Sequence, residues 1–314
     1  MNEVRFSNEI LYPQSIEEWL MLRLETCGAS EAPALLGVHP WLTVAELWAL
    51  KTRRMNKKDS PSKKRGRLLE SVSLDFLREE RPSWTITPNP MPSGKFYRNL
   101  PIRLSCTPDA FAVNPERHGF GIVQIKSVKP SEFRKKWLID GVVEAPIYAV
   151  IQAMLEMFLT GARWACIGPM VVDDGVEMPL VEVTMHEPII AKVIARAREF
   201  WALVAADTPP EFDFAKDGEV LSNLYAGETG ETVDMSGLNW PLELIAEDKA
   251  LMAAIKTAAD RREEIKNMFA AELKEANIAT YNGTVIATRK IVSRKGHTAP
   301  TVQYPKITLR RNLD

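Results

Sequence analysis

Apolar and polar residues alternate through the middle of the chain, between Ile102 and Lys126. Two short runs rich in β-forming residues flank a polar turn that contains Asn114, Pro115 and Gly119. This pattern predicts an antiparallel hairpin, because alternation is typical of half-buried strands and such residues favour turns. The other predicted elements can be arranged around this hairpin.

Three polar residues lie on the predicted hairpin. Asp109 belongs to the first run, whereas Gln124 and Lys126 lie two residues apart on the second. Side chains two residues apart on a strand leave the same face, so the amide and the amine point the same way. Burying a carboxylate, an amide and a lysine together costs free energy. The hairpin is therefore the first candidate for a chemical site.

Apolar residues at spacings of three and four predict helices on both sides of the hairpin, the first of them begun by the capping-box pair Ser15 and Glu18. The expected helices are 15–26, 30–37, 43–50, 66–80, 145–161 and 187–206. Further strands are expected at 163–172 and 180–185, and an irregular strand and loop at 82–100.

Two of these helices carry polar residues of interest. Tyr148, Gln152 and Glu156 recur every four residues and form one stripe on an otherwise apolar helix. A buried glutamine needs hydrogen-bond partners, which either a neighbouring backbone or a site could supply. Glu70 lies near the polar edge of the helix at 66–80, where a single glutamate is usually solvated and gives no signal alone.

Arg23 and Ser30 flank a break in the helical pattern near Gly28. Ser30 is expected to begin the next helix, and an arginine beside a hydroxyl and free backbone N–H groups could bind a phosphate. A capping serine and a surface arginine explain the same residues, and on local grounds this second explanation is favoured.

Two consecutive prolines mark a boundary between a domain at 1–210 and a C-terminal accessory module at 211–314. In the module, apolar residues at helical spacing predict a long charged helix at 242–277. Asn282-Gly283 then predicts a tight hairpin. The module is therefore expected to be a helix followed by a hairpin.

Composition and charge change this picture little. The 314 residues are 46% hydrophobic and 26% charged, and 40 basic residues balance 41 acidic ones. Basic residues nevertheless gather at 51–65 and 289–311, and local patches can bind phosphate in a neutral chain. A solvated loop and a solvated tail explain these two segments equally well.

Three cysteines, Cys27, Cys106 and Cys166, stand far apart without a CxxC spacing. This argues against a zinc ribbon or a clustered iron–sulfur site. An odd number of thiols and no signal peptide favour a reducing compartment, so a cytoplasmic protein is expected. No apolar run approaches the roughly 20 residues of a membrane span.

The order of a helix glutamate, a hairpin aspartate, a residue two before a lysine and a helix glutamine resembles the PD-(D/E)XK nuclease superfamily. More narrowly, the chain resembles the phage lambda exonuclease / YqaJ-type viral recombinase family. The motifs that carry the resemblance are RLETCGAS, LLGVHPWLTVAELW, GRLLE ending at Glu70, TPDAF around Asp109, and PIYAVIQAMLEMFLTG. They cover roughly residues 15–205, and five ordered motifs are more specific than a lone D…xK pair.

The resemblance implies an α/β (α+β) fold with a central mixed sheet flanked by helices. It also implies Mg²⁺- or Mn²⁺-dependent cleavage of DNA with two ions, starting from a 5′ end of the duplex. In that family the residues matching Glu70, Asp109 and Gln124 surround the metals, and the carbonyl of Ile125 is a further oxygen ligand here. Two or three protein oxygens suffice, because Mg²⁺ keeps several waters.

The resemblance assigns four further roles. The residue matching Lys126 contacts the attacking water, and the one matching Gln152 supports the site. Those matching Arg23 and Ser30 bind the 5′ phosphate of the digested strand, which outweighs the local preference for a structural role. A ring-shaped homo-oligomer, double-stranded DNA ends and a single-strand annealing protein are the expected partners, and no membrane is involved.

Gln124 departs from the family pattern, which has an acid at this position. An amide oxygen can coordinate a hard cation but brings no negative charge, so metal binding should weaken. A tolerated natural variant, an engineered substitution and a protein that binds DNA without cutting it all remain open. Glu156 or Glu116 could compensate, although Glu116 is expected in the turn.

Three functions follow from these observations. The leading hypothesis is a metal-dependent exonuclease that resects duplex ends for phage-type recombination. The alternative is a catalytically silent protein that binds DNA ends as a recombination accessory. A protein-interaction module, suggested by the helix at 242–277, is the weakest of the three.

Overall fold

The computed structural model describes residues 8–56 and 59–291, and the chain forms two compact units, Met1–Leu224 and Tyr225–Asp314. The helices of the first unit are α2 (Ile16–Leu24), α3 (Ala32–Leu35), α4 (Val44–Lys51), α5 (Pro61–Glu80), α6 (Pro130–Lys136), α7 (Ile147–Thr160), α8 (Glu187–Ala205) and α9 (Gly218–Leu224). Its strands are β1 (Asn8–Leu11), β2 (Cys27–Gly28), β3 (Thr85–Pro88), β4 (Phe96–Asn99), β5 (Leu104–Cys106), β6 (Ala110–Val113), β7 (Phe120–Val128), β8 (Leu138–Ile139), β9 (Val142–Val143), β10 (Trp164–Val172), β11 (Val176–Glu177) and β12 (Val181–Val183).

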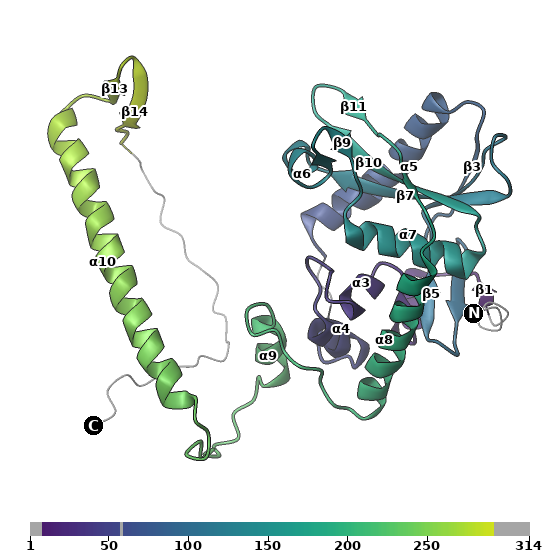
Figure 1. Ribbon diagram of the computed structural model, residues 1–314, viewed down its shortest axis with the longest axis horizontal. Helices are drawn as coiled ribbons and strands as arrows, with labels where there is room; N and C mark the ends of the chain where they lie inside the picture. The colour runs from purple at the N-terminus through teal and green to yellow at the C-terminus, as the bar shows by residue number, and fades with distance from the viewer. Residues whose placement is uncertain (1–7, 57–58, 292–314) are drawn as a thin grey trace. The chain divides into compact units, whose positions relative to one another are not determined.

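Two larger sheets and a two-stranded sheet of β8 and β9 build the first unit (Figure 1). A four-stranded sheet has the order β1-β4-β5-β2, and a six-stranded sheet has the order β11-β10-β7-β6-β3 with β12 also paired to β10. The six-stranded sheet is mixed, because β7 runs parallel to β10 and antiparallel to β6. The expected α/β class, with a mixed sheet flanked by helices, is confirmed.

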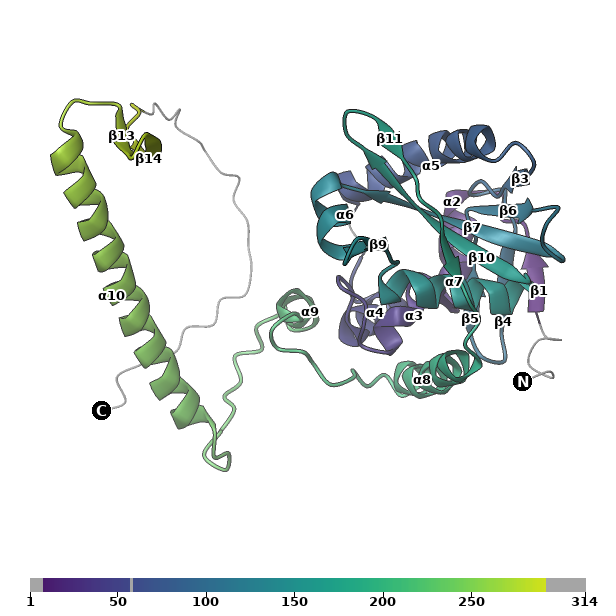
Figure 2. The ribbon, with the colours of Figure 1, turned by 45° about the horizontal axis from the view of Figure 1, so that its top comes forward.

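The central strand β7 is covered on both faces, which explains its nearly continuous apolar sequence. Val123 and Ile125 pack in one core cluster with Leu74 and Leu77 of α5. Ile122 points the other way, into the cluster that contains the buried residues of α7. Figure 2 shows α5 and α7 on opposite sides of β7 and β10. Because α7 also contacts β4 and β5, it connects the two sheets.

The expectation for the central hairpin is only partly right. β6 and β7 do pair antiparallel, with Ala110 opposite Val123. Residues 102–113 are not one strand, however, since β5 belongs to the four-stranded sheet and β6 to the six-stranded sheet. Asp109 lies between them, just before β6. Both strands bury apolar side chains, so the sequence alternation gives no sign of this change of sheet.

The basic segment at 51–65 is also not a single loop. Ser60 caps α5 by accepting a hydrogen bond from the backbone N–H of Lys63, at 3.2 Å, and Pro61 is the first helical residue. The helix therefore begins five residues before the expected 66, and Pro61 suits that first position because its missing N–H needs no partner there. Nearly all of the basic segment at 289–311 lies outside the described residues.

The first unit ends at Leu224, beyond the boundary expected at 210. α9 is part of this unit because Val220 is buried and the buried Asp217 accepts a hydrogen bond from the Thr43 hydroxyl at the start of α4. The two prolines therefore introduce a segment that returns to the domain rather than one that leaves it.

The second unit contains α10 (Pro241–Leu273) and a hairpin of β13 (Ile278–Tyr281) and β14 (Thr284–Thr288). Asn282 and Gly283 have φ values of 49° and 78°, as a two-residue turn of this kind requires. The expected helix-plus-hairpin arrangement is therefore present. Within the described part of the chain, we find no helix with the length and apolar character needed to cross a membrane.

Candidate active site

Asp109 lies where the chain passes from one sheet to the other, and β7 holds its carboxylate. Its Oδ2 accepts a hydrogen bond of 2.6 Å from Gln124 Nε2 and one of 2.7 Å from the backbone N–H of Ile125. Two donors on one oxygen fix the carboxylate against the strand. The structure thus brings together Asp109 and Gln124, as the sequence predicted.

Gln124 and Lys126 point to the α7 side of the sheet, because they alternate with the α5-facing Val123 and Ile125. On α7 they meet the predicted polar stripe. Lys126 Nζ donates to Gln152 Oε1 at 2.9 Å, and Gln152 Nε2 donates to Glu156 Oε1 at 2.8 Å. Gln152 is buried, and both ends of its amide are satisfied. Glu156 therefore orients the amide, and the amide holds the lysine.

Glu70 reaches the same site from the other helix layer. Burial, followed by the nearby charge of Asp109, raises the pKa of Glu70 to about 7, and Lys126 opposes this shift. Burial likewise raises the pKa of Asp109, against the opposing effects of Lys126 and of its two hydrogen bonds. Two carboxyl groups thus share a partly dehydrated environment in which burial favours their neutral forms and the charge of Lys126 favours their ionised forms.

Two buried oxygens in this site have no hydrogen-bond partner. They are Gln124 Oε1 and Glu156 Oε2. A buried unsatisfied acceptor costs about 1–3 kcal/mol, so it calls for a water, an ion or a ligand to pair with it. For Glu156 the cost is reduced by protonation, since burial and then the charge of Asp109 raise its pKa to about 8.

The oxygens present fit a hard divalent cation in kind, although not in charge. Carboxylates of Glu70 and Asp109, the free amide oxygen of Gln124 and a backbone carbonyl at Ile125 are ligands that Mg²⁺ accepts. Within residues 8–56 and 59–291, no three His, Cys, Asp or Glu side chains gather as a metal site. Gln124 accounts for this in part, because an acid there would stand beside Asp109.

The two acids suggested as compensation for Gln124 occupy different places. Glu156 is buried and accepts the hydrogen bond from Gln152, which in turn holds Lys126. Glu116 lies in the turn between β6 and β7, where its backbone N–H donates to Asn114 Oδ1 at 2.9 Å. Of the two, only Glu156 contributes to the network of the site.

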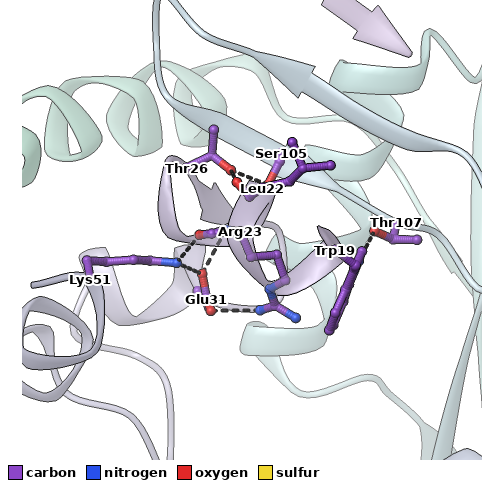
Figure 3. A network of polar contacts seen from close by, with 9 residues as sticks. Trp19, Leu22, Arg23, Thr26, Glu31, Lys51, Ser105 and Thr107 are labelled. Atoms are coloured by element: carbon purple, nitrogen blue, oxygen red, sulfur yellow. Dashed lines mark hydrogen bonds and ion pairs between the residues drawn. The ribbon is translucent and has the colours of Figure 1, made fainter. Parts of the chain in front are cut away.

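Arg23 belongs to a buried ionic cluster beside this site (Figure 3). Its Nη2 lies 2.7 Å from Glu31 Oε1, and Lys51 Nζ lies 2.7 Å from Glu31 Oε2. The N–H of Gly28 also donates to Glu31, at 2.9 Å. Burial would raise the pKa of Glu31, but Arg23 and Lys51 together hold it well below its usual range. Glu31 is therefore an anion that fixes the guanidinium.

Ser30 does not begin a helix, contrary to expectation. It lies exposed in a turn, and α3 starts at Ala32 after Glu31 as its capping position. Arg23 and Ser30 nevertheless line one cavity of about 60 Å³, together with Gln152 and Glu156. The two residues predicted to bind a phosphate thus line the same cavity as Gln152 and Glu156, which follow Lys126 in a series of hydrogen bonds.

Sequence reasoning missed Glu31 and Lys51. Lys51 is the last residue of α4, and its side chain is only 3% exposed. The sequence around Lys51 does not distinguish a buried lysine from a solvated one at a helix end. Its burial depends on how α2, α3 and α4 pack together.

These features define a helix-flanked mixed-sheet domain whose site combines three carboxyl groups, two amides and a lysine. Residues 18–163 match the model of the YqaJ-like viral recombinase domain. This segment is therefore similar to that domain, in agreement with the family that the sequence motifs resemble. It is also 23% identical over 290 residues to the uncharacterized protein YqaJ of Bacillus subtilis (strain 168), covering 90% of this chain and 85% of that protein.

Among solved structures, the chain is similar to an alkaline exonuclease, LHK-Exo, from Laribacter hongkongensis, with 18% identity and a TM-score of 0.44 over 61% of this chain and 93% of that one. It is also similar to a phage related exonuclease from Haemophilus somnus 129PT, with 13% identity and a TM-score of 0.39 over 58% of this chain and 96% of that one.

Proposed function

We propose that this protein is a metal-dependent DNA exonuclease that resects duplex ends from the 5′ side for phage-type recombination. The observation that carries the proposal is the presence of two hydrogen-bonded pairs, Gln124 with Asp109 and Lys126 with Gln152, in a segment similar to the recombinase family. Lys126 lies close enough to Asp109 for its charge to oppose the rise that burial causes in the pKa of that carboxyl group. Glu70 adds a second carboxyl group to the same environment. Hydrolysis of a phosphodiester needs a held water, which Lys126 could orient, and neutralised negative charge, which Lys126 and a cation held by the oxygens of this site would supply.

Each residue has a separate task in this proposal. Asp109, Glu70, the amide oxygen of Gln124 and the carbonyl of Ile125 would hold Mg²⁺ or Mn²⁺, with two ions expected. When bound, such ions stabilise the charge on the attacking and leaving oxygens. Lys126 orients the attacking water.

Gln152 supports Lys126 in this task. It fixes the ammonium group, because its own amide is held by Glu156. A fixed donor loses less conformational freedom on the way to the transition state than a mobile one does.

Arg23 and Ser30 would bind the 5′ phosphate of the strand that is digested. They border the cavity that Gln152 and Glu156 line from the other side, so a terminal phosphate there would lie close to the reacting bond. Arg23 pairs with Glu31 through Nη2 alone, and a guanidinium carries five N–H donors, so donors remain for a phosphate in the cavity. The 5′ polarity itself is proposed from the resemblance to the family.

A second function, a catalytically silent protein that binds DNA ends, is favoured by one observation. Gln124 Nε2 donates a hydrogen bond to Asp109 Oδ2, and the amide brings no negative charge that would hold a cation. This candidate predicts tight, salt-sensitive DNA binding with no turnover at any metal concentration.

Incubation with linear duplex DNA bearing 5′ phosphates, in Mg²⁺ and separately in Mn²⁺, tests both candidates. We expect the wild type to degrade the 5′-phosphorylated strand, Gln124→Glu to do so on the order of 10-fold faster, and Lys126→Ala to be inactive. Inactivity of both wild type and Gln124→Glu would exclude the enzyme. Activity of Gln124→Glu alone would identify a silent DNA-binding protein with an intact scaffold.

The assembly and the partner follow from the same proposal. A ring-shaped homo-oligomer is proposed from the family resemblance. A single-strand annealing protein is proposed on the same ground, and it would pair the single strand that resection leaves. Light scattering of the purified protein checks the oligomer, and a monomeric mass would argue against the ring.

A further inference from the structure

Outside the site, three aromatic side chains form a small cluster in which Trp41 is exposed and His39 and Tyr148 are half-buried. The indole of Trp41 is 66% exposed, yet it is held in place by its neighbours. Its ring centroid lies 5.4 Å from that of Tyr148 and 5.9 Å from that of His39, both edge-to-face, and His39 lies 6.1 Å from Tyr148. We call His39, Trp41 and Tyr148 the aromatic cluster.

The backbone also fixes this cluster. The N–H of Trp41 donates to His39 Nδ1 at 3.1 Å, so the loop between α3 and α4 presents the indole in a defined orientation. An exposed tryptophan that is nevertheless rigid offers a flat apolar face at low entropic cost, which is typical of a binding surface. The aromatic cluster is therefore suited to a ligand with a flat ring of its own.

A cationic segment lies beside the cluster. Lys136 Nζ lies 5.9 Å from the centre of the Trp41 ring. Residues 129–136, which include α6, contain four cations and one acid, and all four cations are exposed. Lys136 is paired with Glu132, and Arg134 lies near Asp173. Both ion pairs are exposed to solvent and therefore weak, so a phosphate can compete for these cations. Cations beside a flat aromatic face suit a ligand that combines rings with phosphates.

The cluster adjoins the candidate active site through two elements. Tyr148 lies one turn before Gln152 on the same face of α7, a rise of about 6 Å. On the other side, β7 carries Lys126 and leads directly into the cationic segment of α6. The two elements that hold the lysine–glutamine pair therefore continue into the aromatic cluster and its cations.

We propose that the aromatic cluster stacks an unpaired base of a single DNA strand next to the site, while the cations of α6 contact its phosphates. Every base has a π-face, so a tryptophan platform accepts single strands with little regard to sequence. This inference rests on the proposed function only for the presence of DNA at the neighbouring site. A protein partner at the same surface is the competing explanation, and it predicts no change in DNA affinity.

Binding of a labelled single-stranded oligothymidylate in EDTA tests the platform without turnover. Stacking on one tryptophan predicts that Trp41→Ala binds about 10-fold more weakly than the wild type, and that Trp41→Phe keeps most of the affinity. Phe214→Ala is the matched control, because Phe214 is an exposed aromatic of the same unit at 82% and should not matter. Thermal unfolding of each variant verifies that it is folded.

An oligonucleotide with abasic positions separates stacking from phosphate contact. The wild type should bind it about as weakly as Trp41→Ala binds the intact strand, and Trp41→Ala should lose nothing further. Lys135→Ala should instead reduce the salt dependence of binding with both strands. Equal affinity of wild type and Trp41→Ala, an equal loss on the abasic strand, or no binding by the wild type would each overturn the platform.

These outcomes are distinguishable from those of the nuclease assay. A protein that binds bases through Trp41 but never cuts DNA would support the platform and refute the exonuclease. A protein that cuts DNA and whose affinity for single strands is unchanged by Trp41→Ala would support the exonuclease and refute the platform.

Discussion

Gln124 has opposite effects on the site with and without a cation. Its Nε2 donates to Asp109, so the metal-free site avoids the repulsion that two adjacent carboxylates would create. Its Oε1 has no hydrogen-bond partner, so it is available to a ligand. An acid at this position would instead add negative charge, which favours a bound cation. The amide therefore stabilises the metal-free protein and weakens the proposed binding of a metal ion.

We expect Gln124→Glu to be less stable than the wild type in EDTA, by about 1–3 kcal/mol, because the substitution removes a donor from Asp109 and adds a like charge. Addition of Mg²⁺ should recover this loss and raise the melting temperature of the variant more than that of the wild type. Thermal unfolding with and without Mg²⁺ measures both effects. Gln14→Glu, at an exposed position, is the control. Equal Mg²⁺ shifts for the variant and the wild type would contradict a cation at this position.

Glu156 makes the stability of the metal-free protein depend on pH. Its pKa is raised from 4.5 to about 8, so the folded state holds the proton more tightly than the unfolded state does. The resulting stabilisation is complete below 4.5 and is lost as the pH rises through about 8. We expect the melting temperature in EDTA to fall across this window, and to fall less for Glu156→Gln, which keeps an oxygen acceptor for Gln152.

A series of melting curves from about pH 5 to about pH 9 measures this difference. Glu187→Gln is a suitable control, because Glu187 is exposed in the first turn of α8. If Glu156→Gln followed the wild type at every pH, Glu156 would be ionised in the folded protein throughout, and its role as a neutral buried partner would be wrong.

At the level of single residues, the sequence predicted the site where local periodicity placed the side chains. Gln124 and Lys126 share a strand face because they are two apart, and Gln152 shares a helix face with Glu156 because they are four apart. Glu31 and Lys51 could not be found this way. Their pairing spans twenty residues and depends on how three short helices pack, which no local pattern encodes.

The elements around Glu31 are joined by charge rather than by regular pairing. Arg23 lies on α2, Gly28 on β2 and Lys51 on α4, and each donates a hydrogen bond to the carboxylate of Glu31. α3 itself has four residues and no side-chain cap, so it has little stability of its own. Glu31 therefore connects this corner of the domain, which also borders the cavity.

We expect Glu31→Gln to destabilise the protein by about 3–5 kcal/mol, because it leaves the buried ammonium of Lys51 and the guanidinium of Arg23 without their counter-charge. Glu199→Gln breaks an exposed pair with Arg196 and should cost less than about 1 kcal/mol. Urea unfolding of both variants measures the difference. Similar midpoints for the two would show that the cluster is not a structural connection.

The order of elements was predictable, whereas their allocation to sheets was not. The helix ending at Gly161 and the strand from Trp164 appear where the apolar periodicity placed them, and Gly161 ends α7 with a φ of 78°. β5 and β6 read as one alternating run, yet they belong to different sheets. A strand's partners are decided by contacts distant in sequence, and buried strands of either sheet have the same local pattern.

For the whole molecule, the position of the boundary decides which fragment is a complete domain. The first unit extends to Leu224 because α9 returns to α4, where Val220 is 2% exposed and Asp217 pairs with Thr43. Pro209 and Pro210 suggested an earlier end, since a proline pair often marks a linker. Only the contacts of α9 with a distant helix show that the linker follows Leu224.

A fragment ending at Leu224 should therefore unfold at nearly the temperature of the same domain in the full chain. A fragment ending at Pro210 should be less stable by about 2–4 kcal/mol, because it lacks the buried side chain of Val220 and leaves the hydroxyl of Thr43 without Asp217. Calorimetry of the two fragments beside the full chain measures this. The longer fragment should also retain the nuclease activity proposed for Asp109 and Lys126, since every residue of that site precedes Leu224. If both fragments melted together, α9 would contribute nothing to the domain and the boundary at 210 would be the correct one.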